Sequence, residues 1–242
     1  MTQALHKYFA LLPISYLLVT IFLVRDQVEL VYAASLVIVI LTFIAQYHLK
    51  TSDELFLARW MAVLSAIGLT ASTILTIEKI ELLSRPDYLA SCSLSPIVAC
   101  SSVITSPQAS VFGFPNTIIG IFGFGAVLAA AMTLLAGRTK LNTAWWRTLL
   151  AGITAAAGFC AWLFYQGVYD IGKLCLYCML VWLVTYSLLW LVTAHSIRHG
   201  HINLGQWANK ILGYKYILIT VTFLIIFLLL FFRWSDYWLS LI

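Results

Sequence analysis

The chain has 242 residues, of which 62% are hydrophobic and only 10% are charged. Because a soluble domain is about half apolar and about a quarter charged, this composition excludes a water-soluble globular protein and predicts an all-α polytopic membrane protein. The formal net charge is +5, but the basic residues form no dense patch and so indicate no nucleic-acid partner. In a membrane protein, positive charge is normally an orientation signal.

Apolar segments of membrane-spanning length recur along the whole chain. A spanning helix needs roughly 20 mostly apolar residues, and seven segments qualify, at about 8–24, 28–47, 56–77, 117–136, 148–167, 174–194 and 214–233. The first segment contains Pro13 and lacks the small-residue cleavage site of a signal peptide. We therefore expect it to be a retained helix.

A long connection, 78–116, joins the third and fourth segments. It holds four of the five prolines and two of the five cysteines, Cys92 and Cys100. Loops of this length in a compact protein are usually functional. Its aromatic end, with Phe112 and Phe114, suits a segment that lies at the membrane surface and covers a pocket.

The charges that flank the segments predict the orientation of the chain. With the N-terminus in the cytoplasm, nine basic and two acidic side chains fall on the cytoplasmic side, against five basic and seven acidic on the other side. The excess of positive charge favours this orientation. It places the loop 78–116 and the start of the sixth segment on the extracytoplasmic side, where disulfides form and persist.

The sixth segment begins with a Cys-x-x-Cys motif formed by Cys175 and Cys178. At a helix start, unpaired backbone N–H groups and the helix dipole favour a thiolate, and Lys173 adds a positive charge nearby. The three-residue offset puts both sulfur atoms on one face of the helix. This arrangement is typical of thiol redox chemistry, although a static disulfide or two buried thiols would have the same spacing.

Haem and zinc fit the cysteines poorly. A c-type haem motif needs histidine after its second cysteine, and this chain has Met179 there. A four-cysteine zinc site usually uses two short-spaced pairs, whereas seven residues separate Cys92 from Cys100. We therefore predict no metal. For the loop pair alone, a disulfide that staples the loop remains an alternative to a redox role.

Other polar positions have less specific interpretations. Asn116, just before the fourth segment, has two compatible interpretations: a helix N-cap and a hydrogen-bond donor to a ligand carbonyl inside the bundle. Cys160 lies mid-membrane without a partner at its depth and is expected to be a small packing residue. His195, His199 and His201 are expected to be solvated in a cytoplasmic loop. The few charges within the spans argue against ion transport.

The chain resembles the vitamin K epoxide reductase family, in its bacterial form, over about residues 56–194. The resemblance rests on Cys92-SLSPIVA-Cys100-SSVITS, on ASVFGFPN ending at Asn116, on IGIFGF, and on CLYC followed by MLVW. It implies a catalytic four-helix bundle that encloses a quinone near the outer surface. Two extra N-terminal spans in 1–55 and one C-terminal span in 195–242 lie outside it.

The resemblance also implies roles for individual residues. Cys178 would act on the quinone ring, Cys175 would pair with Cys178 or transiently with Cys100, and Cys92 would exchange with an external thiol. Trp182 stands where the animal enzymes have a tyrosine, which favours a bacterial quinone user over epoxide reduction. The expected quinone contacts are Ser106, Asn116, Trp182, Phe112 and Phe114.

These features predict a thiol:quinone oxidoreductase of the bacterial inner membrane that supports disulfide formation. We expect no fused thioredoxin domain, so a separate periplasmic DsbA-type thioredoxin-fold protein would reduce Cys92 and Cys100. Electrons would then pass to Cys175 and Cys178 and on to ubiquinone or menaquinone. Such exchange needs a thiolate and an accessible sulfur, and we expect a mobile loop to expose the sulfur.

Three alternatives share part of this pattern. An enzyme that reduces a quinone or its epoxide for the quinone's own sake is mildly disfavoured by Trp182. A transporter or assembly factor with structural disulfides is a second alternative. It predicts that Cys175→Ser lowers the folding yield but leaves residual activity. A DsbB-type four-helix oxidase has the same chemistry but usually carries its Cys-x-x-Cys before its second cysteine pair.

Overall fold

The computed structural model describes residues 9, 11–48, 52–85, 87–137 and 141–239. In these residues all regular structure is helical, apart from two isolated β-bridges. The long helices are α2 (Leu11–Phe22), α3 (Val28–His48), α4 (Asp53–Ser84), α6 (Asn116–Leu135), α7 (Thr143–Tyr165), α8 (Leu176–Arg198) and α10 (Lys215–Arg233). The shorter ones are α5 (Cys100–Thr105), the 3-10 turn η1 (Pro107–Ser110), the π-helical turn η2 (Gln166–Ile171), α9 (Gln206–Leu212) and α11 (Ser235–Leu239).

Six helices in the described residues are long and apolar enough to cross a membrane: α3, α4, α6, α7 extended by η2, α8 and α10. The predicted all-α polytopic membrane fold is therefore confirmed. The first predicted segment, 8–24, coincides with the shorter apolar helix α2, which has 12 residues. Residues 8 and 10 of that segment lie outside the described residues.

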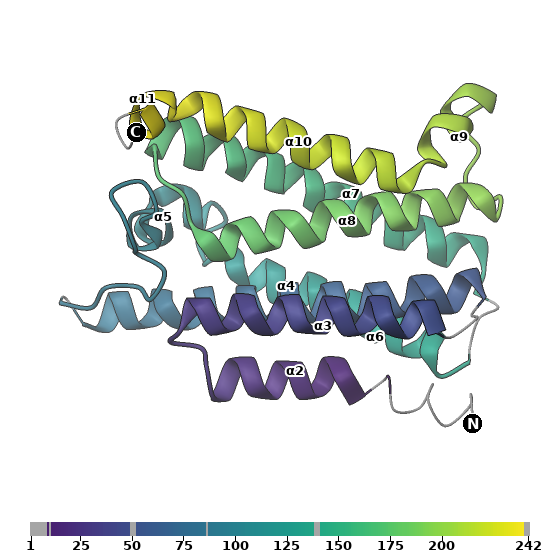
Figure 1. Ribbon diagram of the computed structural model, residues 1–242, viewed down its shortest axis with the longest axis horizontal. Coiled ribbons are helices and arrows are strands. Elements are labelled where there is room, and N and C mark those ends of the chain that lie inside the picture. Colours follow the sequence, from purple (N-terminus) through teal and green to yellow (C-terminus); the bar gives the residue numbers. More distant parts are fainter. Residues whose placement is uncertain (1–8, 10, 49–51, 86, 138–140, 240–242) are drawn as a thin grey trace.

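The helices lie roughly side by side along the long axis of the molecule (Figure 1). Helix α4 is central and packs against α2, α3, α6 and α8, while α7 and α10 pack against α8. Small residues allow close approach between membrane helices. At Gly68 of α4, an added Cβ would lie 2.5 Å from the ring of Phe124 on α6. Helix α10 has no buried residue, so it covers the outside of the bundle.

Helix α4 is longer than the predicted span 56–77. It starts after Ser52, whose side chain accepts a hydrogen bond from the Leu55 N–H, and it ends just before Arg85 and Pro86. A proline disfavours the helical conformation in the residue that precedes it, which here is Arg85. Glu78 and Lys79, which were expected in the loop, are thus on the last turns of a buried helix.

The loop after α4 folds over one end of the bundle, where α8 begins and where α11 also lies (Figure 1). It contains α5 and η1 and leads into α6. One β-bridge folds the loop on itself, between Ser93 and Ala99. The other joins Val98 to Leu174, so that the loop is attached to the segment that precedes α8.

Candidate functional site

The two loop cysteines form a disulfide. Cys92 and Cys100 are bonded, with their Cα atoms 5.6 Å apart, as the spacing predicts for a small closed ring. Both residues are fully buried. The loop sulfur atoms are therefore inaccessible in this arrangement, and their exposure by movement of the loop stays a prediction.

Two backbone hydrogen bonds place the loop disulfide beside the start of α8. Leu174 donates its N–H to the Ile97 carbonyl at 2.8 Å, and its own carbonyl accepts the Ala99 N–H at 3.0 Å. Cys100 and Cys175 directly follow the residues of this bridge. The bridge thus fixes two cysteines from distant parts of the sequence next to each other.

Three sulfur atoms meet at this point. The Sγ atoms of Cys92, Cys100 and Cys175 all lie within 4.8 Å of one another, and the Sγ of Cys178 is 2.8 Å from that of Cys175. Metal binding by cysteine needs thiolates, and the disulfide leaves none on the two loop cysteines. The grouping instead suits thiol–disulfide exchange, in which a thiolate attacks a neighbouring disulfide sulfur.

The start of α8 shapes the Cys-x-x-Cys motif. Cys175 is the N-cap residue, and its sulfur accepts the Cys178 N–H at 3.4 Å. The predicted position of the motif at a helix start is confirmed. An N-cap sulfur lies at the positive end of the helix dipole, which stabilises negative charge on it.

The two N-terminal helices contact the residues between these cysteines. Tyr32 on α3 donates its hydroxyl to the Leu176 carbonyl at 2.7 Å. Tyr177, which is fully buried, donates its hydroxyl to the Arg25 carbonyl at 3.3 Å, in the turn between α2 and α3. Sequence reasoning assigned no role to these helices, yet they bond to both middle residues of the motif.

A buried carboxylate holds the loop closed. Glu78 of α4, which is 2% exposed, accepts the Ser91 N–H at 3.1 Å and the Tyr88 hydroxyl at 3.0 Å. Burial, followed by the hydrogen bond and the negative charge of Glu78, raises the pKa of Tyr88 to about 12. The phenol therefore stays protonated and keeps donating to Glu78. Both bonds hold the loop segment that directly precedes Cys92, whose sulfur is buried.

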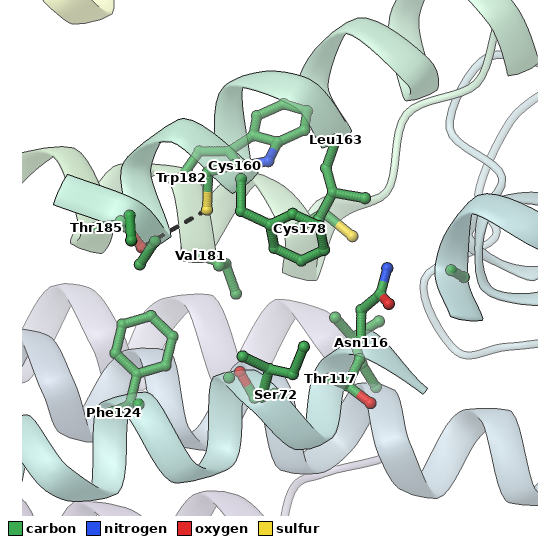
Figure 2. Close-up of a pocket in the computed structure, with 18 of the residues that line it drawn as sticks. Ser72, Asn116, Thr117, Phe124, Cys160, Leu163, Cys178, Val181, Trp182 and Thr185 are labelled. Carbon is green, nitrogen blue, oxygen red and sulfur yellow. Dashed lines mark hydrogen bonds between the residues drawn. The ribbon is translucent and has the colours of Figure 1, made fainter. Parts of the chain in front are cut away.

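A cavity of about 770 Å³ lies between α4, α6, α7, α8 and the loop. Cys178, Trp182 and Thr185 of α8 line one wall, with Cys160 of α7 beside them (Figure 2). Asn116, Thr117 and Phe124 of α6 and Ser72 of α4 line the opposite wall. The wall is mostly apolar with a few polar groups, as in most small-molecule sites.

The predicted quinone contacts fall at or beside this cavity. Ser106, Phe112, Asn116 and Trp182 are among the residues that line it. Phe114 is not among them and instead stacks on Phe112, with ring centroids 6.2 Å apart. Trp182 is buried and meets the ring of Phe164 edge-on at 5.0 Å, so its indole is held in one orientation.

Asn116 has a different local role from the N-cap interpretation. The N-cap of α6 is Pro115, which supplies no side-chain cap. Asn116 instead accepts the Val111 N–H at 3.2 Å and donates to the Gln108 carbonyl at 2.7 Å. It therefore fastens the η1 segment to the bundle and lines the cavity at the same time.

Two further residues differ from expectation. Cys160 is buried as predicted, but its sulfur lies 3.9 Å from the Thr185 hydroxyl and borders the cavity. Lys79, which the sequence placed in the loop, is only 9% exposed, lines the cavity and donates to the Ser110 hydroxyl. An ionisable residue directly after an apolar span was the signal that could have drawn attention to it.

Of the three histidines expected in a solvated loop, His195 departs from the prediction, whereas His199 is exposed and His201 is partly exposed just after α8. His195 belongs to α8, is buried and packs on Trp146 with ring centroids 4.4 Å apart. His199 lies against His195 at 4.2 Å. Burial, with the nearby His199 and Arg147, lowers the pKa of His201. The Trp146 ring also stacks on His201, with ring centroids 5.6 Å apart, so Trp146 and His195 pack the end of the bundle opposite to the cysteines.

The comparisons with known proteins agree with this geometry. A sequence model of the vitamin K epoxide reductase family matches residues 59–193. The chain belongs to this family. No curated protein matches the chain.

The family assignment covers the whole site. The matched range includes both cysteine pairs, all of α6 and α7, and most of α4 and α8. The family consists of membrane oxidoreductases that use a quinone or vitamin K as the electron partner. Helices α2, α3 and α10 lie outside the matched range.

Proposed function

We propose that the protein is a membrane thiol:quinone oxidoreductase that oxidises a dithiol protein and reduces a quinone. One observation carries this proposal: the Cys175 sulfur lies within 4.8 Å of both sulfurs of the loop disulfide. Its partner Cys178 lines the apolar cavity. The four cysteines thus connect the loop to the cavity in two short steps.

The electron path follows from disulfide exchange. A reduced dithiol attacks Cys92, the Cys92–Cys100 bond breaks, and the second thiol of that partner releases Cys92 as the partner becomes a disulfide. Cys100 then attacks Cys175 of an oxidised Cys175–Cys178 pair, which releases Cys178 as a thiolate beside the cavity and forms a Cys100–Cys175 bond. Cys92 attacks Cys100 of that mixed disulfide, which restores Cys92–Cys100 and releases Cys175. Cys175 and Cys178 return to a disulfide as they give two electrons and two protons to a quinone, which becomes a hydroquinone.

The cavity fits a quinone headgroup by size and chemistry. Its volume of about 770 Å³ lies within the range of roughly 300–1,000 Å³ typical of small-molecule sites. Aromatic walls at Phe112 and Trp182 suit a flat ring, and the Asn116 amide suits a ring carbonyl. We expect ubiquinone or menaquinone as the electron acceptor, and the assay compares the two.

The orientation and the partner belong to this proposal. The charge bias along the sequence favours a cytoplasmic N-terminus, which puts the loop in an extracytoplasmic, oxidising compartment such as the periplasm of a bacterium. We expect a separate DsbA-type thioredoxin-fold protein as the dithiol donor. Because Cys92 is fully buried, the loop must open before that partner can attack.

The direct test follows quinone absorbance during turnover. Purified protein in detergent receives a reduced DsbA-type protein and a soluble quinone, beside Cys178→Ala and Cys160→Ala variants. We expect quinone loss to equal dithiol oxidation, to vanish in Cys178→Ala and to persist in Cys160→Ala, because only the former removes a relay sulfur. A folded protein that consumes none of several quinones would contradict the proposal and favour structural disulfides.

A further inference from the structure

Lys79 is a buried cation at the wall of the cavity. Its side chain is 9% exposed, and it comes from α4, the central helix of the bundle. Charged groups within membrane spans are costly and are usually functional. The relay described above uses no residue of α4, so the cost of burying this ammonium needs another explanation.

The surroundings of Lys79 offer it no compensating negative charge. In the described part of the chain no carboxylate lies within 4 Å of its ammonium, because the three ion pairs found there involve other residues. The adjacent Glu78 accepts from Ser91 and Tyr88 instead. The ammonium donates to the Ser110 hydroxyl, which uses one of its three donors.

The cavity as a whole carries positive but no negative charge. Among the described residues that line it, none is acidic, and the cations are Lys79 and Lys173. Lys173 is half-buried and donates to the Pro96 carbonyl at 2.5 Å, on the loop. Lys79 is the more deeply buried of the two, and it contacts the same η1 segment that Asn116 holds.

We propose that Lys79 is a catalytic residue that binds the quinone oxygen on which negative charge develops. This inference rests on the proposed function. As the electron pair leaves Cys178, a ring carbonyl gains charge until it takes up a proton, and the two thiols supply the two protons overall. A pre-positioned donor in a water-poor site stabilises such charge strongly. The ammonium thereby recognises the reduced, anionic form in preference to the neutral quinone.

Equilibrium binding tests this charge preference without turnover. The probes are neutral 1,4-naphthoquinone and 2-hydroxy-1,4-naphthoquinone, which is an anion at neutral pH, bound to full-length protein in the Cys178→Ala background. We expect Lys79→Met to weaken binding of the anion about 10- to 100-fold, in line with the loss of one close charge pair in a partly buried site, and to change binding of the neutral quinone less than about threefold.

Three matched variants separate the possible roles of Lys79. Lys79→Arg keeps the charge and should retain most of the preference for the anion. Ser110→Ala removes the contact to η1 but leaves the ammonium, and should retain it as well. Lys210→Met removes an exposed lysine of α9 and should behave like the parent protein. If Ser110→Ala weakens binding of the anion as much as Lys79→Met does, Lys79 acts only by holding the loop in place and the inference is wrong.

Turnover and stability provide further readouts. In the parent enzyme with intact cysteines, Lys79→Met should lower kcat about 100-fold, the range measured for single oxyanion donors, with KM nearly unchanged. Burying a charge without a counter-charge is costly, and Lys79→Met removes that cost, so the melting temperature should not fall. Equal losses for the anion and the neutral quinone would overturn the role of Lys79. A parent protein that binds neither probe and turns over no quinone would instead contradict the proposed function.

Discussion

Opening of the loop over Cys92 should be controlled by Glu78. The carboxylate accepts two hydrogen bonds, from the Ser91 N–H and the Tyr88 hydroxyl. In Glu78→Gln an NH2 group, which donates and cannot accept, replaces one of the two oxygens. A hydrogen bond to a charged group is worth about 1.5–3 kcal/mol, and about 1.4 kcal/mol corresponds to a tenfold change in an equilibrium. The open state should therefore become about 10- to 100-fold more populated.

The assay measures how fast a small dithiol reduces the loop disulfide. A Cys175→Ser/Cys178→Ser background leaves Cys92–Cys100 as the pair to be reduced, and alkylation followed by a mass shift reports the released thiols. Since a fully buried disulfide reacts only after opening, the rate should follow the population of the open state. Glu78→Gln should raise it about 10- to 100-fold.

A matched variant tests whether charge alone explains the effect. Asp87→Asn removes a negative charge from an exposed residue of the same loop and should leave the rate unchanged. If Glu78→Gln reduces no faster than the parent, the two bonds of Glu78 do not limit access to Cys92. Equal acceleration in both variants would attribute the effect to loop charge and refute the reasoning as well.

Three further predictions concern the helices around the site. Tyr177→Phe removes the hydrogen bond to the Arg25 carbonyl and should destabilise the protein by about 1 kcal/mol. The reduction potential of the Cys-x-x-Cys pair should shift by up to about 30 mV, which a redox-buffer titration measures. Gly68→Ala should push the Phe124 ring toward the cavity and raise KM for the quinone, whereas Gly158→Ala, with open space at its Cβ, should not. The raised pKa of Tyr88 predicts a stabilising contribution that is present below pH 10 and lost as pH rises through about 12, measured as a loss of melting temperature that Tyr88→Phe lacks.

Much of the fold was predictable because the deciding signals are local. Spans of apolar residues define the helices regardless of their neighbours, and the two cysteines of Cys-x-x-Cys sit at a helix start whose sequence is contiguous. The end of α4 was missed for an equally local reason. A hydropathy window stops where Glu78 and Lys79 begin, whereas the helix continues through residues that favour helix until it meets Pro86.

The contacts that complete the site could not be read from the sequence. Tyr32 and Leu176 are 144 residues apart, and Tyr177 and Arg25 are 152 apart, so no spacing rule connects them. The same holds for Asn116, whose position before a helix suggested a cap although its amide binds the preceding loop. His195 was assigned to a loop because the predicted span ends at about 194, whereas α8 continues to Arg198 and His195 packs on Trp146.

The arrangement of the sulfur atoms favours electron transfer through the four cysteines over a disulfide that only closes the loop. A disulfide that only closed the loop would need Cys92 and Cys100 alone, and the backbone could join α8 anywhere. Here Leu174 pairs with the loop on both its N–H and its carbonyl, which brings a third sulfur to within 4.8 Å. That sulfur caps a helix whose next turn carries Cys178 into the cavity. A purely structural disulfide needs none of these features, whereas each of them shortens the path of electrons from the loop disulfide to a bound acceptor.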